Sequence, residues 1–260
     1  MKDLVYVVGT GSKWQDNELR FSLRSVAKNL TGYGKVWIIG DCPCFVQGVE
    51  HRYYPDNDLS GNNNDANMID KILFACQQEI SEEFIFMNDD FFVLKPMHVD
   101  EIPVMHKGDM TEKPKDYWRI TGIWQQRLLN TFNQLKARGM STMLYDMHCP
   151  MPMNKTLFPE VIKNWDYKVE PGLNFRSIYG NTIHKGEGLR NNGHKFTVFT
   201  RKIYPVIKKE AERAWFMAVN DSGLTSVSKS FIRSMFLEQS EFEKTVPANY
   251  MIGTKCNEKL

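Results

Sequence analysis

One stretch constrains the fold of this chain more than any other: residues 84–92, which read FIFMNDDFF. Apolar residues run directly into the triplet Asn88-Asp89-Asp90, after which apolar residues resume. A short apolar run of this kind is typical of a strand buried on both faces, as in a parallel sheet. The triplet then marks the carboxyl end of the strand, where ligands bind in open α/β sheets. Because Asn and Asp also favour turns, a plain turn is the alternative interpretation.

The two adjacent acids indicate a bound cation. Neighbouring carboxylates repel each other, and a divalent cation together with phosphate supplies the counter-charge. The apolar run 215–219 ends in a similar way at Asn220-Asp221, and a sheet can bring two strand ends together. We therefore predict a Mg²⁺ or Mn²⁺ site with Asp89, Asn220 and Asp221 as ligands and Asp90 beside them.

Strand and helix patterns alternate through the first half of the chain, which predicts right-handed βαβ units, a Rossmann-like α/β architecture and a mostly parallel sheet flanked by helices. The expected strands are 3–8, 35–39 and 49–54, and the expected helices are 16–30 and 65–80, with a loop between 56 and 67. In the second half we expect strands at 91–96, 143–146 and 215–219, helices at 117–138, 157–167 and 226–238, and a mobile loop at 185–195.

Composition is that of a globular protein. The chain has 260 residues, of which 42% are hydrophobic, so it can bury a sizeable core. It has no apolar run of about 18 residues and no signal-peptide pattern, which predicts no membrane span. Five cysteines without zinc-like spacing fit a reducing, cytoplasmic environment. A net charge of +2 neither demands nor excludes a nucleic-acid partner.

A phosphate-binding turn is predicted after the first strand. The segment Gly9-Thr10-Gly11 lets backbone amides approach a phosphate, although Trp14 breaks the dinucleotide-binding GxGxxG spacing and a plain tight turn explains it equally well. Arg20 and Arg24 follow on the next helix and share one face because they are four residues apart. They are either phosphate ligands or solvated surface charges.

Two further residues are candidates for the chemistry. His148 precedes Pro150 and Pro152, which we expect to hold it in a fixed, extended setting as a general base or phosphate contact. A structural histidine is the alternative. Arg176 lies in a segment bounded by glycines, where its guanidinium can neutralise a transferring phosphoryl group.

Several of these motifs, in this order, resemble the sequence blocks of the Stealth proteins. Residues 17–25 and 84–92 resemble the second block, 148–152 with 158–159 and 174–176 are similar to the third, and 220–221 with 236–238 and 240–244 are similar to the fourth. The first block departs from the family: residues 5–12 read VYVVGTGS in place of a VYTWVDGSD-type run, and Cys149 interrupts the HMP-type run. The chain is also shorter than typical members.

The resemblance implies a GT-A-like fold and transfer of a sugar-1-phosphate from a nucleotide sugar to an acceptor hydroxyl. It implies one domain over residues 1–244, with a nucleotide-sugar half at 1–96, an acceptor and catalytic half with a smaller sub-lobe at 97–244, and a tail at 245–260. Asp90, His148 and Arg176 become the expected catalytic residues, with His148 or Asp90 taking the acceptor proton. The expected donor-binding residues are Gly9, Thr10, Gly11, Arg20, Arg24 and Asn88.

Three functions remain open at this point. The first is a hexose-1-phosphate transferase that uses a UDP-sugar. The second is a GT-A-type glycosyltransferase that moves the sugar alone onto a glycan or a modified nucleic acid such as phage DNA. The third is an inactive sugar- or nucleotide-binding module. The product nucleotide separates them, since phosphotransfer releases UMP, glycosyl transfer releases UDP, and a binding module releases neither.

Overall fold

The computed structural model describes residues 1–57, 63–200 and 202–244. Its main sheet has the order β4-β3-β1-β5-β9, and β9 alone of these five runs antiparallel to its neighbour. The strands are β1 (Lys2–Val8), β3 (Tyr33–Gly40), β4 (Glu50–Arg52), β5 (Glu83–Asn88) and β9 (Met151–Asn154). The central strands β1 and β5 are apolar along nearly their whole length because both faces are covered.

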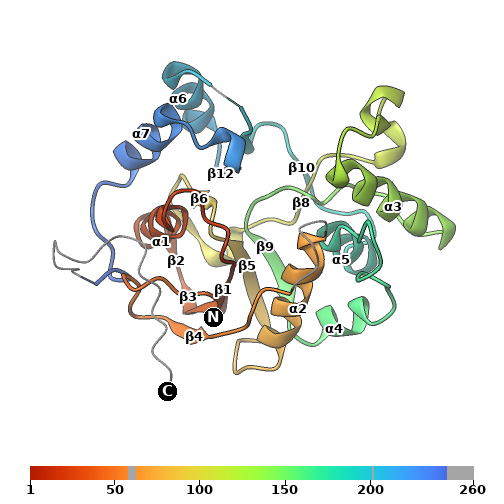
Figure 1. Cartoon of the computed structure of the whole chain (residues 1–260), viewed down its shortest axis with the longest axis horizontal. Coiled ribbons are helices and arrows are strands. Elements are labelled where there is room, and N and C mark those ends of the chain that lie inside the picture. Colours follow the sequence, from red (N-terminus) through yellow and green to blue (C-terminus); the bar gives the residue numbers. More distant parts are fainter. Residues whose placement is uncertain (58–62, 201, 245–260) are drawn as a thin grey trace.

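Helices cover both faces of this sheet (Figure 1). The chain moves from β1 to β3 in one direction and from β4 to β5 in the other, so right-handed crossovers place α1 and α2 on opposite faces. These helices are α1 (Asn17–Asn29), α2 (Asn64–Cys76), α4 (Leu157–Ile162) and α5 (Phe175–Ile183), with α3 (Ile123–Ala137) packed further out against α5.

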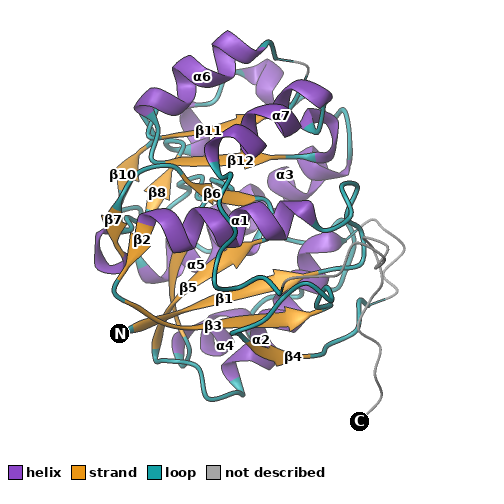
Figure 2. Ribbon diagram, turned by 90° about the vertical axis from the view of Figure 1, so that its left-hand side faces the viewer, coloured by secondary structure: helices purple, strands orange, loops and turns teal. Residues whose placement is uncertain are grey.

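A second, smaller sheet has the order β11-β12-β6 and is covered by two helices on its outer side (Figure 2). Its elements are β6 (Phe91–Val93), β11 (Lys195–Val198), β12 (Phe216–Val219), α6 (Tyr204–Arg213) and α7 (Ser226–Met235). Helix α1 lies between the two sheets and binds β6 through hydrogen bonds from its buried polar side chains. Ser22 Oγ donates to the Phe91 carbonyl, and Asn29 Nδ2 donates to the Val93 carbonyl at 2.7 Å.

Short elements complete the structure. The strands β2 (Leu30–Thr31) and β7 (Met97–His98) pair with each other, as do β8 (Met105–His106) and β10 (Leu189–Arg190). Single 3₁₀ turns span Val99–Glu101, Met110–Glu112, Lys115–Trp118 and Asp221–Gly223. Among the helices that the structure describes, none is long and apolar enough to cross a membrane.

The predicted α/β architecture, a mostly parallel sheet flanked by helices, is confirmed. Three local predictions are wrong. The helix expected from Tyr117 begins only at Ile123, after Gly122. The strand expected at 143–146 does not form, because α5 side chains take its amides: Asn181 Oδ1 accepts from the Met143 amide. The loop expected at 185–195 carries β10 and the first residue of β11. The predicted tail 245–260 lies outside the described residues.

Candidate active site

The strand ends predicted to meet do share one edge of the fold. Parallel pairing sets Val7 opposite Asn88, so the turn after β1 and the end of β5 lie together. Antiparallel pairing sets Ala218 opposite Phe91, so β12 ends where Asp89 and Asp90 lead into β6.

Asn220 and Asp221 have other contacts at this edge. The Asn220 side-chain oxygen caps the next turn by accepting from the Gly223 amide at 2.9 Å. The Asp221 carboxylate lies 3.7 Å from Lys13 Nζ. Their predicted role as metal ligands stays a prediction.

Asp89 and Asp90 are half-buried and repel each other. Withdrawal from water raises the pKa of Asp89 well above its ordinary value, and the charges of Asp90, Glu18 and Asp16 raise it further. Withdrawal from water also raises the pKa of Asp90, against the opposing effect of His148, Lys195 and Arg176. One oxygen of Asp90, Oδ1, is buried without a hydrogen-bond partner.

These neighbours give the site two electrostatically different sides. On the acidic side Asp89 faces carboxylates, including that of Glu18, which is buried and accepts a hydrogen bond from Ser12 Oγ at 2.9 Å. On the basic side the charges of a histidine, a lysine and an arginine from three distant parts of the chain act on Asp90 and oppose the rise of its pKa. The acidic side attracts a cation, and the basic side attracts an anion.

His148 lies on the basic side, in a backbone setting that differs from the prediction. Its φ of 48° is in the left-handed region and not extended. The prediction was wrong because Pro150 restricts the residue directly before it, Cys149, and not the one before that. His148 Nε2 lies 3.4 Å from Asp146 Oδ1, and its ring meets the edge of Phe91.

Asp146 is a site residue that the sequence analysis missed. It is 1% exposed, and its Oδ2 accepts a hydrogen bond from the Trp124 indole at 3.0 Å. Burial would raise the pKa of its carboxyl, but His148, Lys107 and Arg176 outweigh burial and hold the pKa well below the ordinary value. Asp146 is therefore an ionised partner that orients His148. The sequence feature that could have indicated this role is the position of Asp146 two residues before His148.

Arg176 is held rigidly in the first turn of α5, which the Asn174 side chain caps. It is 2% exposed and packs on the rings of Phe86 and Phe175. Its guanidinium donates to Asn88 Oδ1 at 3.3 Å and lies 3.6 Å from Asp146 Oδ1. The structure thus brings together four residues predicted for the site: Asn88, Asp90, His148 and Arg176.

Lys195 is the second missed residue. It begins β11, is buried, and donates a hydrogen bond to Thr197 Oγ1. Burial lowers its pKa to about 8, with the charges of Asp90 and Asp146 acting in the opposite sense. Lys195 could not be recognised from the sequence because the surrounding tract, rich in Lys, Gly and Asn, has the composition of a solvated loop.

Arg20 and Arg24 are directed to a different partner. Both guanidinium groups bind the carboxylate of Glu243, at 2.8 Å and 2.7 Å, and Arg24 also donates to the carbonyls of Phe236 and Leu237. These contacts fasten the segment after α7 onto α1. A donor-binding role for the two arginines stays a prediction.

The turn after β1 is held by a carboxylate. Asp56 Oδ2 accepts hydrogen bonds from the Thr10 amide at 2.9 Å and the Thr10 hydroxyl at 2.8 Å, and Asp56 Oδ1 binds the buried Lys71 ammonium. A Cβ at Gly9 would meet the Asp56 carboxylate at 3.5 Å, an ordinary contact, and one at Gly11 would meet nothing within 4 Å. The amide and hydroxyl of Thr10 thus bind a carboxylate, that of Asp56. A role of this turn in binding a donor phosphate stays a prediction.

The residues present fit a divalent cation whose coordination a substrate completes. Within the described ranges no group of three or more His, Cys, Asp or Glu side chains is arranged to hold a metal ion. Mg²⁺ is commonly held by only one or two carboxylates together with substrate phosphates. The pair Asp89 and Asp90, with its unpaired buried oxygen, matches that pattern.

The comparisons with known proteins identify the fold of the chain but assign it to no family. No protein-family model matches the chain, and no curated protein matches it. Among solved structures, the galactosyltransferase LgtC in complex with donor and acceptor sugar analogues has a TM-score of 0.50 at 11% identity, covering 92% of this chain and 98% of LgtC. Mouse xyloside xylosyltransferase 1 has a TM-score of 0.41 at 9% identity, covering 86% and 99%. The likeness to LgtC shows that the chain has a GT-A-like α/β fold.

Proposed function

We propose that this protein is a nucleotide-sugar glycosyltransferase, which moves the sugar of a nucleoside-diphosphate sugar to an acceptor hydroxyl. The observation that carries the proposal is the two-sided site at the strand ends: carboxylates around Asp89, and cationic side chains around Asp90. A donor diphosphate bound with a cation has the complementary charges. The fold is similar to that of LgtC, a galactosyltransferase whose structure holds donor and acceptor sugar analogues, and this likeness supports the proposal.

The mechanism follows from where each group lies. Asp89 and Asp90 would hold a Mg²⁺ or Mn²⁺ ion, which when bound supplies charge neutralisation for the diphosphate. As the bond from the sugar to the diphosphate breaks, negative charge grows on the leaving oxygen. Arg176 and Lys195 lie preorganised in buried positions where they stabilise that charge.

His148 takes the acceptor proton in this proposal. Asp146 Oδ1 lies 3.4 Å from its Nε2 and fixes the ring, and the side chain is 36% exposed, so an acceptor can reach it. Asp90 is the alternative base, with His148 as a cation that steadies the phosphate. The acceptor is a glycan or another hydroxyl compound, and a modified nucleic acid is also compatible with the charge of the chain.

Transfer of the sugar together with its phosphate is the second candidate. It is favoured by one observation: Asp90, His148 and Arg176, which carry the Stealth resemblance, come from distant segments and converge on one cluster. The likeness to the galactosyltransferase LgtC favours sugar transfer alone. A catalytically silent binding module is disfavoured, because two repelling carboxylates destabilise a protein that makes no use of them.

The product nucleotide tests the proposal. The purified chain is incubated with UDP-glucose, UDP-galactose and UDP-N-acetylglucosamine in the presence of Mn²⁺, and the products are separated by anion-exchange chromatography. Release of UDP supports glycosyl transfer, and release of UMP identifies sugar-phosphate transfer. A chain that binds these donors but releases neither nucleotide is a binding module.

A further inference from the structure

Unpaired buried polar atoms gather on one side of the proposed active site. In the described part of the chain, five buried side-chain polar atoms lack a hydrogen-bond partner. One is His184 Nε2, and the other four are Asp65 Oδ2, Asp90 Oδ1, Asp146 Oδ1 and Arg176 Nε. Buried polar groups are normally hydrogen-bonded because leaving one unpaired costs free energy. Unpaired atoms on neighbouring residues therefore indicate groups kept for a ligand.

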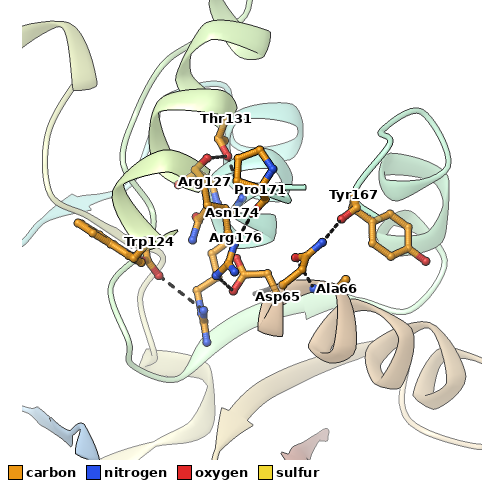
Figure 3. A network of polar contacts seen from close by, with 12 residues as sticks. Asp65, Ala66, Trp124, Arg127, Thr131, Tyr167, Pro171, Asn174 and Arg176 are labelled. Atoms are coloured by element: carbon orange, nitrogen blue, oxygen red, sulfur yellow. Dashed lines mark hydrogen bonds and ion pairs between the residues drawn. The ribbon is translucent and has the colours of Figure 1, made fainter. Parts of the chain in front are cut away.

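Of the four residues other than His184, Asp65 is the one that the proposed mechanism does not use. It lies in the first turn of α2, behind the N-cap residue Asn63, and is 5% exposed. Its Oδ1 lies 3.3 Å from Arg127 Nη1 of α3, while Arg127 Nε donates to the Pro171 carbonyl at 3.2 Å. Figure 3 shows Asp65 and Arg127 facing each other, with Arg176 beside them. Arg127 thus fixes one oxygen of Asp65 and leaves the other available.

The surroundings join Asp65 to the active site. Burial raises the pKa of the Asp65 carboxyl, and the charges of Arg127, Arg176 and His148 oppose that rise while the charge of Asp146 adds to it. Thr131 Oγ1 donates to the Arg127 carbonyl and accepts from the Asn174 amide. These two hydrogen bonds link α3, which carries Arg127, to the start of α5, which carries Arg176. Asp65, Arg127, Asp146 and Arg176 therefore form one buried cluster, which we call the Asp65 cluster.

The charges of the Asp65 cluster decide what kind of ligand fits. The cluster contains two carboxylates and two guanidinium groups in two ion pairs, so it carries no net charge when all four are ionised. A phosphate would be repelled by both carboxylates, and an apolar group would leave the unpaired atoms without partners. Asp146 Oδ1 keeps its ionic contacts with His148 and Arg176. An uncharged ligand that presents several hydroxyl groups can donate to Asp65 Oδ2 and accept from the Arg176 Nε–H. A sugar ring has this chemistry.

We propose that Asp65, held in place by Arg127, binds hydroxyl groups of the sugar ring that is transferred, and so determines which sugar the enzyme accepts. The inference rests on the proposed function and adds its sugar subsite. Asp65 is a specificity-determining residue in this account, since it binds hydroxyls away from the bond that breaks. A subsite that pairs buried polar atoms with substrate hydroxyls discriminates strongly against sugars that lack those hydroxyls.

The test is the affinity of Asp65→Asn for a nucleotide with and without its sugar. Calorimetry with Mn²⁺ compares UDP with the UDP-sugar that the wild type prefers. We expect Asp65→Asn to bind the UDP-sugar about 10- to 100-fold more weakly and UDP with unchanged affinity. Asp70→Asn is the matched control, because Asp70 is on the same helix and is bound instead by Tyr167 at 2.6 Å and by Lys168. Equal affinity of Asp65→Asn and wild type for the UDP-sugar overturns the inference.

Two further arms separate the remaining outcomes. If Asp65→Asn binds the donor normally but its transfer rate falls only when acceptor is limiting, the hydroxyls belong to the acceptor and the donor assignment is overturned. If Asp65→Asn does not fold, the wild type is tested with UDP-sugars that each lack one ring hydroxyl. Weaker binding of one of them by about 10-fold or more supports the inference, and equal binding of all overturns it. Failure of the wild type to bind UDP or any UDP-sugar instead contradicts the proposed function itself.

Discussion

Replacing Glu243 with glutamine should destabilise the whole fold, although this residue lies near the end of the described chain. Its carboxylate is fully buried and binds both Arg20 and Arg24 of α1, and it also accepts from the Ser240 amide at 3.1 Å. The contacts with Arg20 and Arg24 join residues more than 200 positions apart. Loss of the charge leaves two guanidinium groups without their counter-ion.

The size of the effect follows from burial. Removing one partner of a buried ion pair costs about 3–5 kcal/mol, and the two arginine side chains keep 18% and 15% exposure, so we expect the lower end, about 3 kcal/mol. For a chain of this size that corresponds to a fall in Tm of about 6–12 °C at pH 7.

The effect should also depend on pH. Burial would raise the pKa of Glu243, but hydrogen bonds from Arg24, the Ser240 amide and Arg20 lower it below its ordinary 4.5. Because the folded state lowers this pKa, the stabilisation is complete above 4.5 and is lost as pH falls through the lower, folded value. The difference in Tm between Glu243→Gln and wild type should therefore be large at pH 7 and shrink below pH 4.5.

Thermal unfolding followed by circular dichroism at several pH values measures both quantities. Glu241→Gln is the matched control, since Glu241 is the nearest exposed acid. A fall in Tm of less than about 2 °C for Glu243→Gln at pH 7, or a difference in Tm that does not change with pH, would contradict this prediction.

UDP titration of Arg24→Ala tests the predicted donor-binding role of this arginine. Unchanged UDP affinity with a lowered Tm means that Arg24 stabilises the fold and does not bind the donor.

Two predictions concern the chemistry. His148→Ala should lower kcat by about 10²–10⁴-fold with little change in donor affinity, and steady-state kinetics checks this. A fall in both kcat and folded fraction, with normal turnover per folded molecule, would make the histidine structural. If Lys195 neutralises the leaving diphosphate, wild-type activity should decline as pH rises through about 8, where burial places its pKa. The Lys195→Met enzyme should be slow at every pH, and an unchanged alkaline limb in this variant would assign the limb to another group.

The sequence was sufficient to predict the mostly parallel sheet and the strand ends that share one of its edges. The apolar run into Asn88-Asp89-Asp90 forms a buried strand, β5, that ends at the predicted edge, because hydrophobic periodicity and strand-end polarity are local properties. The pairing of β12 with β6 then brings the second strand end, Asn220-Asp221, to this edge.

What the sequence could not predict depends on contacts between distant residues. Arg20 and Arg24 have the spacing of a phosphate-binding pair, but Glu243 reaches them from the opposite end of the chain. Lys195 has the sequence surroundings of a solvated charge, but it begins β11 and is buried. Asp65 resembles an ordinary acid in a helical first turn, and only the packing of α3 brings Arg127 to it.

The proposed function requires Asp89 and Asp90 to bind the donor diphosphate through a divalent cation. Calorimetric titration of UDP into wild type and into Asp89→Asn, each with Mn²⁺ and with EDTA, tests it directly. We expect the wild type to bind UDP with Mn²⁺ and to lose most of that affinity in EDTA. We expect Asp89→Asn to bind UDP weakly both with Mn²⁺ and with EDTA. Equal UDP affinity in Mn²⁺ and EDTA for wild type, or Mn²⁺-dependent binding that survives in Asp89→Asn, would contradict it.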